Sequence, residues 1–206
     1  MKIVVLDKRT KKRAAAVVAA AFFDYPMMQH YFPDAGKRRR VLLWYMGKTL
    51  ECAMRYGEVL VTEECAGVMF VLPPGHVRLT DMEYIKCGFL LAPFMMGFGN
   101  YKKSNKCEKF VADTHARLMN GRDHYYLWGL VADPAAQRTG VGKALLQTLT
   151  DKADAESMPV FLETHEQRNV SYYNQFGFEL VCETVIPEQG LDLWCMIREP
   201  LVEVSD

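Results

Sequence analysis

Apolar and polar residues alternate along the N-terminal part of the chain in patterns that predict short strands and helices. Residues 2–7 form an apolar run typical of a strand. Residues 10–23 have the Ala- and Val-rich pattern of a helix, for which Thr10 is the expected N-cap. Turn-forming residues among aromatics predict a loop over residues 24–36. Apolar side chains at steps of three and four then predict a helix over residues 37–56.

The middle of the chain combines a hairpin pattern with a less regular helical one. Residues 58–62 and 67–71 are strand-like runs separated by polar residues, which predicts a β-hairpin. Residues 81–120 are helix-like but interrupted by proline and glycine, which predicts two helices joined by a glycine-rich elbow. Residues 88–96 are too short and proline-broken for a membrane span, so we interpret them as a buried helix or a flap beside a substrate.

The C-terminal half has the pattern of an α/β unit. Residues 125–132 are almost continuously apolar, which predicts a central strand buried on both faces. Residues 140–155 form an amphipathic helical pattern. The elements predicted after it are a strand at 160–164, a short helix at 169–175 and two strands at 178–186 and 191–198. This order predicts a sheet with crossover helices.

Composition favours one reduced, cytoplasmic domain. A chain of 206 residues can bury a core without disulfides, so we expect a single domain over residues 1–206. Lysine plus arginine equal aspartate plus glutamate at 25 each, which gives no global field for nucleic acid or membrane. The six cysteines show no metal-ligand spacing, and charge comes too early at the N-terminus for a signal peptide. We interpret the basic run at residues 37–40 as the solvated start of a helix.

A glycine-containing turn follows the predicted central strand. Residues 137–142 read Gln-Arg-Thr-Gly-Val-Gly and open the amphipathic helix. Glycines let such a turn direct backbone N–H groups inward, and the helix N-terminus adds its positive dipole end, so the turn can hold a phosphate. Many similar turns only pack a helix on a sheet. A Walker A loop fits poorly because Lys143 is followed by Ala144, and a dinucleotide fingerprint fits poorly because its third glycine is missing.

The turn resembles the main motif of the GNAT superfamily of acyl-coenzyme A N-acyltransferases, Gln/Arg-x-x-Gly-x-Gly/Ala after a strand that ends in Asp-Pro. Residues 132–143 match this motif, and residues 169–178 resemble the family segment Asn-x-x-x-Tyr-x-x-x-Gly-Phe. Two motifs in the right order and spacing are specific. The resemblance implies an α/β (α+β) fold, in which helices flank a mixed, mainly antiparallel sheet that is splayed between its fourth and fifth strands.

The resemblance further implies that acetyl-CoA lies in the splay, without a metal. Backbone amides of the turn would bind its diphosphate, and the end of the central strand would pair with its pantetheine arm. The residues implied in acetyl-CoA binding are Leu130, Val131, Ala132, Gln137, Arg138, Thr139, Gly140, Val141, Gly142, Lys143, Asn169 and Tyr173. Asn169 suits a helix N-cap equally well. Residues 1–120 would form the acceptor side and residues 121–200 the acyl-CoA-binding half.

Direct transfer of the acetyl group to a primary amine is the reaction that the resemblance implies. A backbone N–H near Val131 or Ala132 would donate to the carbonyl oxygen. Tyr173 would protonate the departing thiolate, and Glu163 would accept the proton of the amine. Two alternatives stay open, because Tyr173 can simply pack in the core, and Glu163 can pair with a cation while water carries the proton.

The acceptor itself is not specified by any motif. Aromatic residues between Tyr25 and Phe32 hint at a small or partly apolar amine. We expect His124 and His165 at the surface. The alternative function is a non-catalytic acyl-CoA-binding or interaction module of the same fold, against which the intact Tyr173 argues. A homodimer is left open.

Overall fold

The computed structural model describes residues 1–201 and contains a seven-stranded sheet with the order β1-β2-β3-β4-β5-β7-β6. The strands are β1 (Ile3–Val5), β2 (Glu58–Thr62), β3 (Gly67–Leu72), β4 (Tyr125–Ala132), β5 (Val160–Thr164), β6 (Glu179–Ile186) and β7 (Leu191–Arg198). Neighbouring strands are antiparallel except for β4 and β5, which are parallel. The predicted mixed, mainly antiparallel sheet is therefore confirmed.

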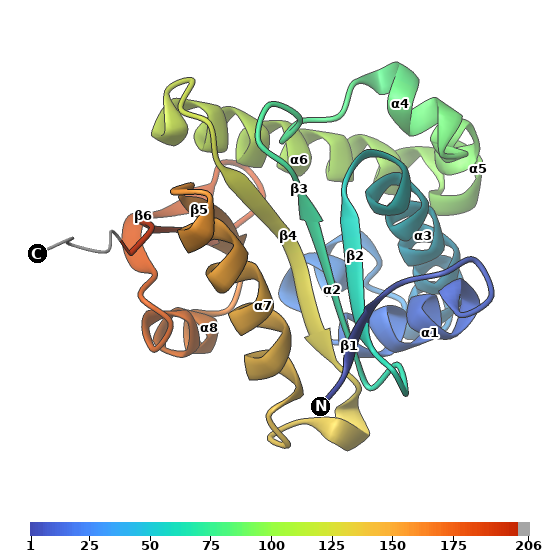
Figure 1. The fold of residues 1–206 in the computed structure, drawn as a ribbon. Helices are drawn as coiled ribbons and strands as arrows, with labels where there is room; N and C mark the ends of the chain where they lie inside the picture. Colours follow the sequence, from blue (N-terminus) through green and yellow to red (C-terminus); the bar gives the residue numbers. More distant parts are fainter. Residues whose placement is uncertain (202–206) are drawn as a thin grey trace, which may run out of the picture.

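Helices cover both faces of the sheet. They are α1 (Lys11–Ala21), α2 (Pro26–Tyr31), α3 (Ala35–Tyr56), α4 (Asp81–Lys86), α5 (Ala92–Met96), α6 (Phe98–Met119), α7 (Val141–Ala155) and α8 (Gln167–Asn174), with short 3₁₀ turns η1 (Phe89–Leu91) and η2 (Pro134–Ala136). Apolar residues of α1 and α3 pack on one face of the sheet, whereas those of α7 and α8 pack on the other. Figure 1 shows α7 lying along β4 and α6 crossing one end of the sheet.

Strand β4 separates from β5 soon after the two strands meet. Tyr125 pairs with Val160 and Tyr126 pairs with the next residue of β5, but no later residue of β4 pairs with β5. On its other side, β4 carries an irregularity at Trp128, because Gly129 and Leu127 pair with consecutive residues of β3. Extra residues of this kind bend a strand and increase its twist. The predicted splay between the fourth and fifth strands is thus present.

Gly129 is needed at this bend because no other residue would fit. A Cβ atom built there would lie 2.1 Å from Cζ of Phe70, whose ring covers the bend. That ring also packs edge-on against Trp128, with 5.8 Å between the ring centroids. The backbone of β4 therefore lies directly against the Phe70 ring, close to the point where β4 separates from β5.

Two local predictions in the N-terminal half are wrong. Residues 24–36 are not only loop, since they contain helix α2, which begins at Pro26. Proline at the first position of a helix has the required φ and lacks an N–H that would have had no partner there. Thr10 occupies the N-cap position of α1 but does not cap it, because its hydroxyl and amide groups both bond to Asp7.

The region predicted as two helices is divided further. Its first half consists of α4, η1 and α5, and only α6 is long. The stretch at residues 88–96 is not a buried helix, since Leu90 and Phe94 are 65% and 73% exposed. Its other face, with Phe89 and Met96, lines a cavity, as the flap interpretation requires. Within residues 1–201, no helix has both the length and the apolar character that a bilayer crossing needs.

The basic run at residues 37–40 is not fully solvated. Arg38 is buried at 7% exposure, and its guanidinium donates to the carbonyl oxygens of Phe32 and Pro33 at 2.7 and 3.2 Å. The same guanidinium lies 4.5 Å from the ring centroid of Phe23. Arg38 therefore satisfies carbonyl groups just after α2 and joins that helix to α3.

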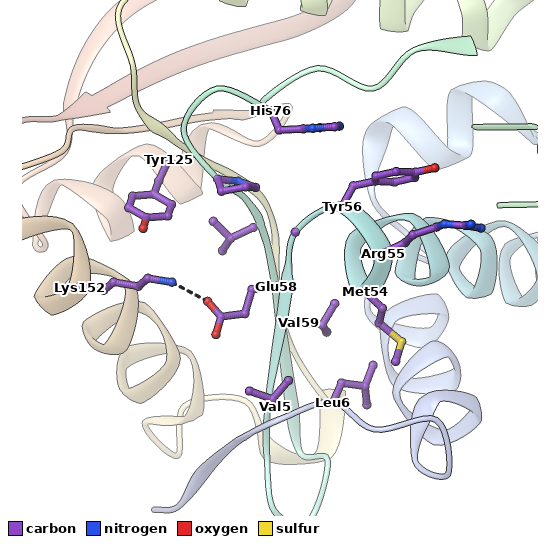
Figure 2. Close-up of a pocket in the computed structure, with 13 residues that line it drawn as sticks. Val5, Leu6, Met54, Arg55, Tyr56, Glu58, Val59, His76, Tyr125 and Lys152 are labelled. Carbon is purple, nitrogen blue, oxygen red and sulfur yellow. Dashed lines mark hydrogen bonds and ion pairs between the residues drawn. The ribbon is translucent and has the colours of Figure 1, made fainter. Parts of the chain in front are cut away.

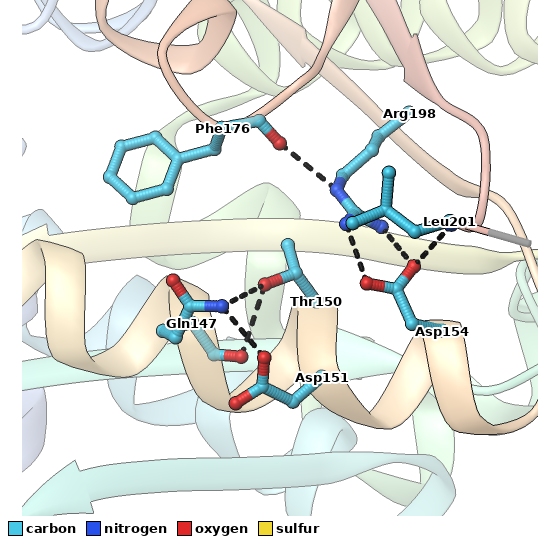
Figure 3. Close-up of polar contacts among 7 residues, drawn as sticks. All are labelled: Gln147, Thr150, Asp151, Asp154, Phe176, Arg198 and Leu201. Carbon is cyan, nitrogen blue, oxygen red and sulfur yellow. Dashed lines mark hydrogen bonds and ion pairs between the residues drawn. The ribbon is translucent and has the colours of Figure 1, made fainter. Parts of the chain in front are cut away.

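A bidentate ion pair ties the end of β7 to α7 (Figure 3). Both terminal nitrogens of Arg198 lie 2.7 Å from a carboxylate oxygen of Asp154. Arg198 is 5% exposed and also donates through Nε to the carbonyl of Phe176, while the amide of Leu201 donates to Asp154. Every polar group of this network has a partner, so the loss of one carboxylate charge would leave a buried guanidinium unpaired.

We expect Asp154→Asn to destabilise the protein by about 3 kcal/mol, because a buried arginine is left without its counter-ion. Hydrogen bonds and the Arg198 charge hold the pKa of Asp154 below its ordinary value. The ion pair therefore stabilises fully above the ordinary aspartate pKa, and this contribution is lost as the pH falls through the lowered pKa. Urea unfolding at pH 7 and at low pH would measure the loss in free energy of unfolding and its dependence on pH. Glu63→Ala, in the exposed Lys2–Glu63 pair, is the control and should leave the urea midpoint almost unchanged. Equal losses at both sites would contradict the prediction.

Candidate functional site

The turn before α7 presents a row of unused backbone donors. Gly140 is the N-cap of α7 with φ +86°, and Arg138 also lies in the left-handed region with φ +64°. The backbone N–H groups of residues 138–143 donate to no acceptor within residues 1–201, and no side chain caps this helix. The turn is exposed except for the half-buried Gly142 and for Val141, whose side chain packs in the core. These free amides at a helix N-terminus form the arrangement that binds an anion.

Tyr172 is a residue at this turn that the sequence did not identify. A Cβ atom added to Gly142 would lie 2.9 Å from the Tyr172 hydroxyl, so the phenol stands directly against the turn. Tyr172 and Tyr173 project from the same short helix, and their ring centroids are 5.4 Å apart. Only the packing of α8 against the start of α7 brings the hydroxyl here, and no spacing in the sequence indicates this contact.

A cavity of about 1140 Å³ opens where β4 leaves β5. Of the predicted site residues, those that line it are Leu130, Val131, Ala132, Gln137, Glu163, Asn169 and Tyr173. Residues 138–143 do not line this cavity but lie beyond Gln137, around the N-terminus of α7. The two groups of predicted residues therefore occupy neighbouring parts of one region.

Glu163 is the most perturbed carboxylate in this cavity. Its Oε1 accepts a hydrogen bond from the Tyr126 hydroxyl, and its buried Oε2 has no partner within residues 1–201. Burial raises the pKa of Glu163 to about 8; the charge of Glu108 adds to this rise, whereas the Tyr126 bond opposes it. The interpretation of Glu163 as the partner of a cation is therefore wrong for the described residues. A carboxyl group with this pKa can accept a proton near neutral pH.

Tyr173 combines packing with access to the cavity. It is 9% exposed, and its ring packs against Phe178 with the centroids 5.6 Å apart. Its hydroxyl forms no hydrogen bond to the described residues. Burial raises the pKa of Tyr173, helped by the nearby Tyr25, so the phenol keeps its proton at working pH. Core packing and a role as proton donor are compatible in this geometry.

Asn169 does not cap its helix. The N-cap of α8 is Glu166, and Asn169 is the third residue of the helix. Its side-chain amide donates to Oγ1 of Thr164 at 2.9 Å, at the end of β5. The hydroxyl of Tyr25 lies 3.2 Å from the same Oγ1. These bonds join the N-terminal half of the chain to the end of β5, where the cavity begins.

The expected surface positions of His124 and His165 are wrong. They are only 3% and 6% exposed. His124 bonds to His115 with 2.6 Å between their Nε2 atoms, and Nδ1 of His165 lies 2.7 Å from the carbonyl oxygen of Asp192. Burial lowers the pKa of both histidines. The hydrogen-bond partners of both histidines belong to other elements, since His115 lies in α6 and Asp192 lies in β7. The sequence pattern around each histidine therefore does not reveal its burial.

A second, smaller cavity of about 680 Å³ lies beside β2 and the end of α3 (Figure 2). Tyr56 and His76 stack there with 5.4 Å between ring centroids, and Lys152 pairs with Glu58 at 3.0 Å. The residues that line it include none of the predicted site residues. We therefore assign the site to the larger cavity. No group of three or more potential metal ligands occurs within residues 1–201.

Comparisons with known proteins agree with this geometry. Residues 76–178, half of the chain, match the Acetyltransferase (GNAT) family. An uncharacterised N-acetyltransferase of Schizosaccharomyces pombe is 24% identical over 152 residues, which cover 71% of this chain and 62% of that protein. The chain thus aligns with less than two thirds of the length of this curated relative.

Solved structures share the fold along the whole chain. A structure of histone acetyltransferase HPA2 and related acetyltransferase from Corynebacterium glutamicum has a TM-score of 0.63 at 17% identity, covering 99% of this chain and 98% of that one. An agmatine N-acetyltransferase has a TM-score of 0.60 at 13% identity, covering 96% of this chain and 100% of that one. With half of its residues matching the family and its sheet splayed between β4 and β5, the chain belongs to the GNAT acetyltransferase family.

Proposed function

We propose that the protein is an N-acetyltransferase that moves an acetyl group directly from acetyl-CoA to a primary amine of a small acceptor. The observation that carries this proposal is the convergence of Glu163 and Tyr173 on one cavity, beside the free amides of residues 138–143. A proton acceptor, a proton donor and an anion-binding turn are the groups that acyl transfer from a thioester to an amine requires.

Each group of the site has a separate role in the proposed reaction. Acetyl-CoA supplies an acetyl group activated as a thioester. Backbone amides of residues 138–143 bind the diphosphate, while a backbone N–H near Val131 or Ala132 donates to the carbonyl oxygen as negative charge develops on it. Glu163 accepts the proton that the amine releases as the C–N bond forms. Tyr173 donates its proton to the sulfur as the C–S bond breaks.

The relatives support an amine as the acceptor. The Schizosaccharomyces pombe protein is named an N-acetyltransferase, and one structural neighbour is named for agmatine. The cavity is lined from both parts of the chain, since Tyr45 and Phe89 face it from one side and Ala132 and Tyr173 from the other. We therefore also propose that residues 1–120 form the acceptor side of a single domain and residues 121–200 its acyl-CoA-binding half.

The direct test measures thiol release from acetyl-CoA in the presence of a panel of primary amines, and binding of CoA by calorimetry. We expect both CoA binding and amine-dependent thiol release. Binding of CoA without transfer to any amine on a broad panel would favour the non-catalytic binding module of the same fold. Absence of CoA binding would contradict both functions.

Gly140→Val should weaken CoA binding about tenfold, since a β-branched residue strains the left-handed backbone of the turn and displaces its amides. Gly190→Val is a matched control. Gly190 also has a left-handed φ, and a Cβ atom at either position has no neighbour within 4 Å. Calorimetric titration with CoA compares the two variants with the unchanged protein. Equal affinities for both variants would show that the turn does not bind the diphosphate.

A further inference from the structure

Two half-buried carboxylates that have no cationic partner within residues 1–201 face the larger cavity from different elements. Glu163 belongs to β5, and Glu108 belongs to α6. Oε1 of Glu108 accepts a hydrogen bond from the Tyr31 hydroxyl at 3.1 Å, and this is its only hydrogen bond within residues 1–201. Both side chains line the same cavity, and the charge of Glu108 contributes to the raised pKa of Glu163. Each therefore has an oxygen available to a ligand in the same cavity.

Each positive charge around the cavity lies in an ion pair, and Arg78 and Lys109 share the single carboxylate of Asp113. Four cationic side chains line it, and their ion pairs are Arg78 and Lys109 with Asp113, Arg122 with Glu199, and Arg168 with Glu166. The histidines in the wall add no charge, because burial lowers the pKa of His115 to about 3 and also lowers that of His124 and His165. Burial raises the pKa of Glu108 as well as that of Glu163, so each carboxyl group ionises most readily beside a cation, which favours a cationic ligand.

Aromatic rings line the larger cavity together with Glu108. Tyr45 and Tyr84 line the cavity, and each packs edge-on against Phe89 with centroids 5.6 and 5.4 Å apart. Burial raises the pKa of both tyrosines, and the charge of Glu108 adds to the rise. A carboxylate beside aromatic faces binds an ammonium or guanidinium group through charge and cation–π attraction together.

On the basis of the proposed acetyl transfer, we propose that the acceptor is a small aliphatic diamine or an amine that carries a guanidinium group. Its reacting amino group lies at Glu163, and its second cation binds Glu108 among the tyrosines. Glu108 is therefore a specificity-determining residue. A monoamine of the same length would leave the carboxylate of Glu108 without a cationic partner.

The experiment compares 1,4-diaminobutane with 1-aminobutane as acceptors, using the full chain. The unchanged protein should prefer the diamine in kcat/KM by about tenfold or more, the gain expected for a charged hydrogen bond. Glu108→Gln should remove most of this preference, chiefly through the KM of the diamine, while keeping the Tyr31 hydrogen bond; the ratio of the two kcat/KM values is compared because the lost charge also changes the pKa of Glu163 for both amines. Glu188→Gln, at an exposed carboxylate that pairs with Lys106 of α6, is the control and should behave like the unchanged protein.

The outcomes separate this inference from the proposed function. Equal use of both amines, or a diamine preference that survives Glu108→Gln, would overturn the assignment of Glu108 and leave acetyl transfer intact. Preference for a lysine-containing peptide over the diamine would contradict the proposal that the acceptor is a small molecule. If CoA binds but no amine is acetylated, the proposed function fails, and calorimetry with 1,4-diaminobutane then decides whether the cavity binds a dication through Glu108.

Discussion

Glu163→Gln should reduce the turnover number about 100-fold at pH 8, because general bases typically contribute 10²- to 10⁴-fold. The amide keeps the shape of the side chain and can still accept the hydrogen bond of Tyr126, so we expect unchanged CoA affinity and folding. Steady-state kinetics at saturating acetyl-CoA, with calorimetry of CoA binding, would measure both. The control is Glu179→Gln, an exposed glutamate on β6.

The pH profile gives this prediction a second measurement. With burial raising the pKa of Glu163 to about 8, kcat/KM should increase with pH and level off above that value, apart from the titration of the amine itself. Tyr126→Phe removes a hydrogen bond that lowers the pKa of Glu163, so the inflection should move to higher pH. Full activity and an unchanged profile in Glu163→Gln would favour a water route for the proton instead.

Tyr173→Phe should lower turnover about tenfold or more with little change in CoA affinity, since only the hydroxyl that protonates the thiolate is removed. Phenylalanine keeps the ring contact with Phe178, so the melting temperature should change little. Rapid-mixing measurement of thiol release at saturating substrates would determine the rate of the chemical step.

A matched control removes a phenol outside the cavity. Tyr56→Phe, at the smaller cavity, should leave turnover within about twofold. If turnover is also unchanged in Tyr173→Phe, proton donation must be assigned elsewhere, and core packing would be the remaining role of Tyr173. Loss of turnover together with a large drop in melting temperature would likewise favour packing.

The elements with the strongest patterns were predicted almost to the residue. Strand β4 covers the predicted residues 125–132, and α7 begins one residue after Gly140, where its predicted range starts. These segments combine a long regular pattern with clear stop signals, so local information is sufficient. Helix α2 was missed because its six residues are too few to show a helical period among the turn formers.

The candidate site was predictable only as far as its motifs extend. The turn at residues 137–142 and the position of Tyr173 follow from local sequence, because each motif lies within one segment. Glu108 has no such signal. Helix α6 carries many charged residues, and the side that faces β5 depends on how the helix crosses the sheet.

Family membership, the order of the main elements along the chain and the glycine-containing turn before α7 can therefore be predicted from the sequence alone, since motifs, backbone preference and periodicity each lie within a few residues. The electrostatics of the cavity arises only on folding. The raised pKa of Glu163 and the unpaired state of Glu108 depend on desolvation by residues far away in sequence, and on which cations already have partners. Those quantities follow from three-dimensional packing, because burial and ion pairing are properties of the assembled chain.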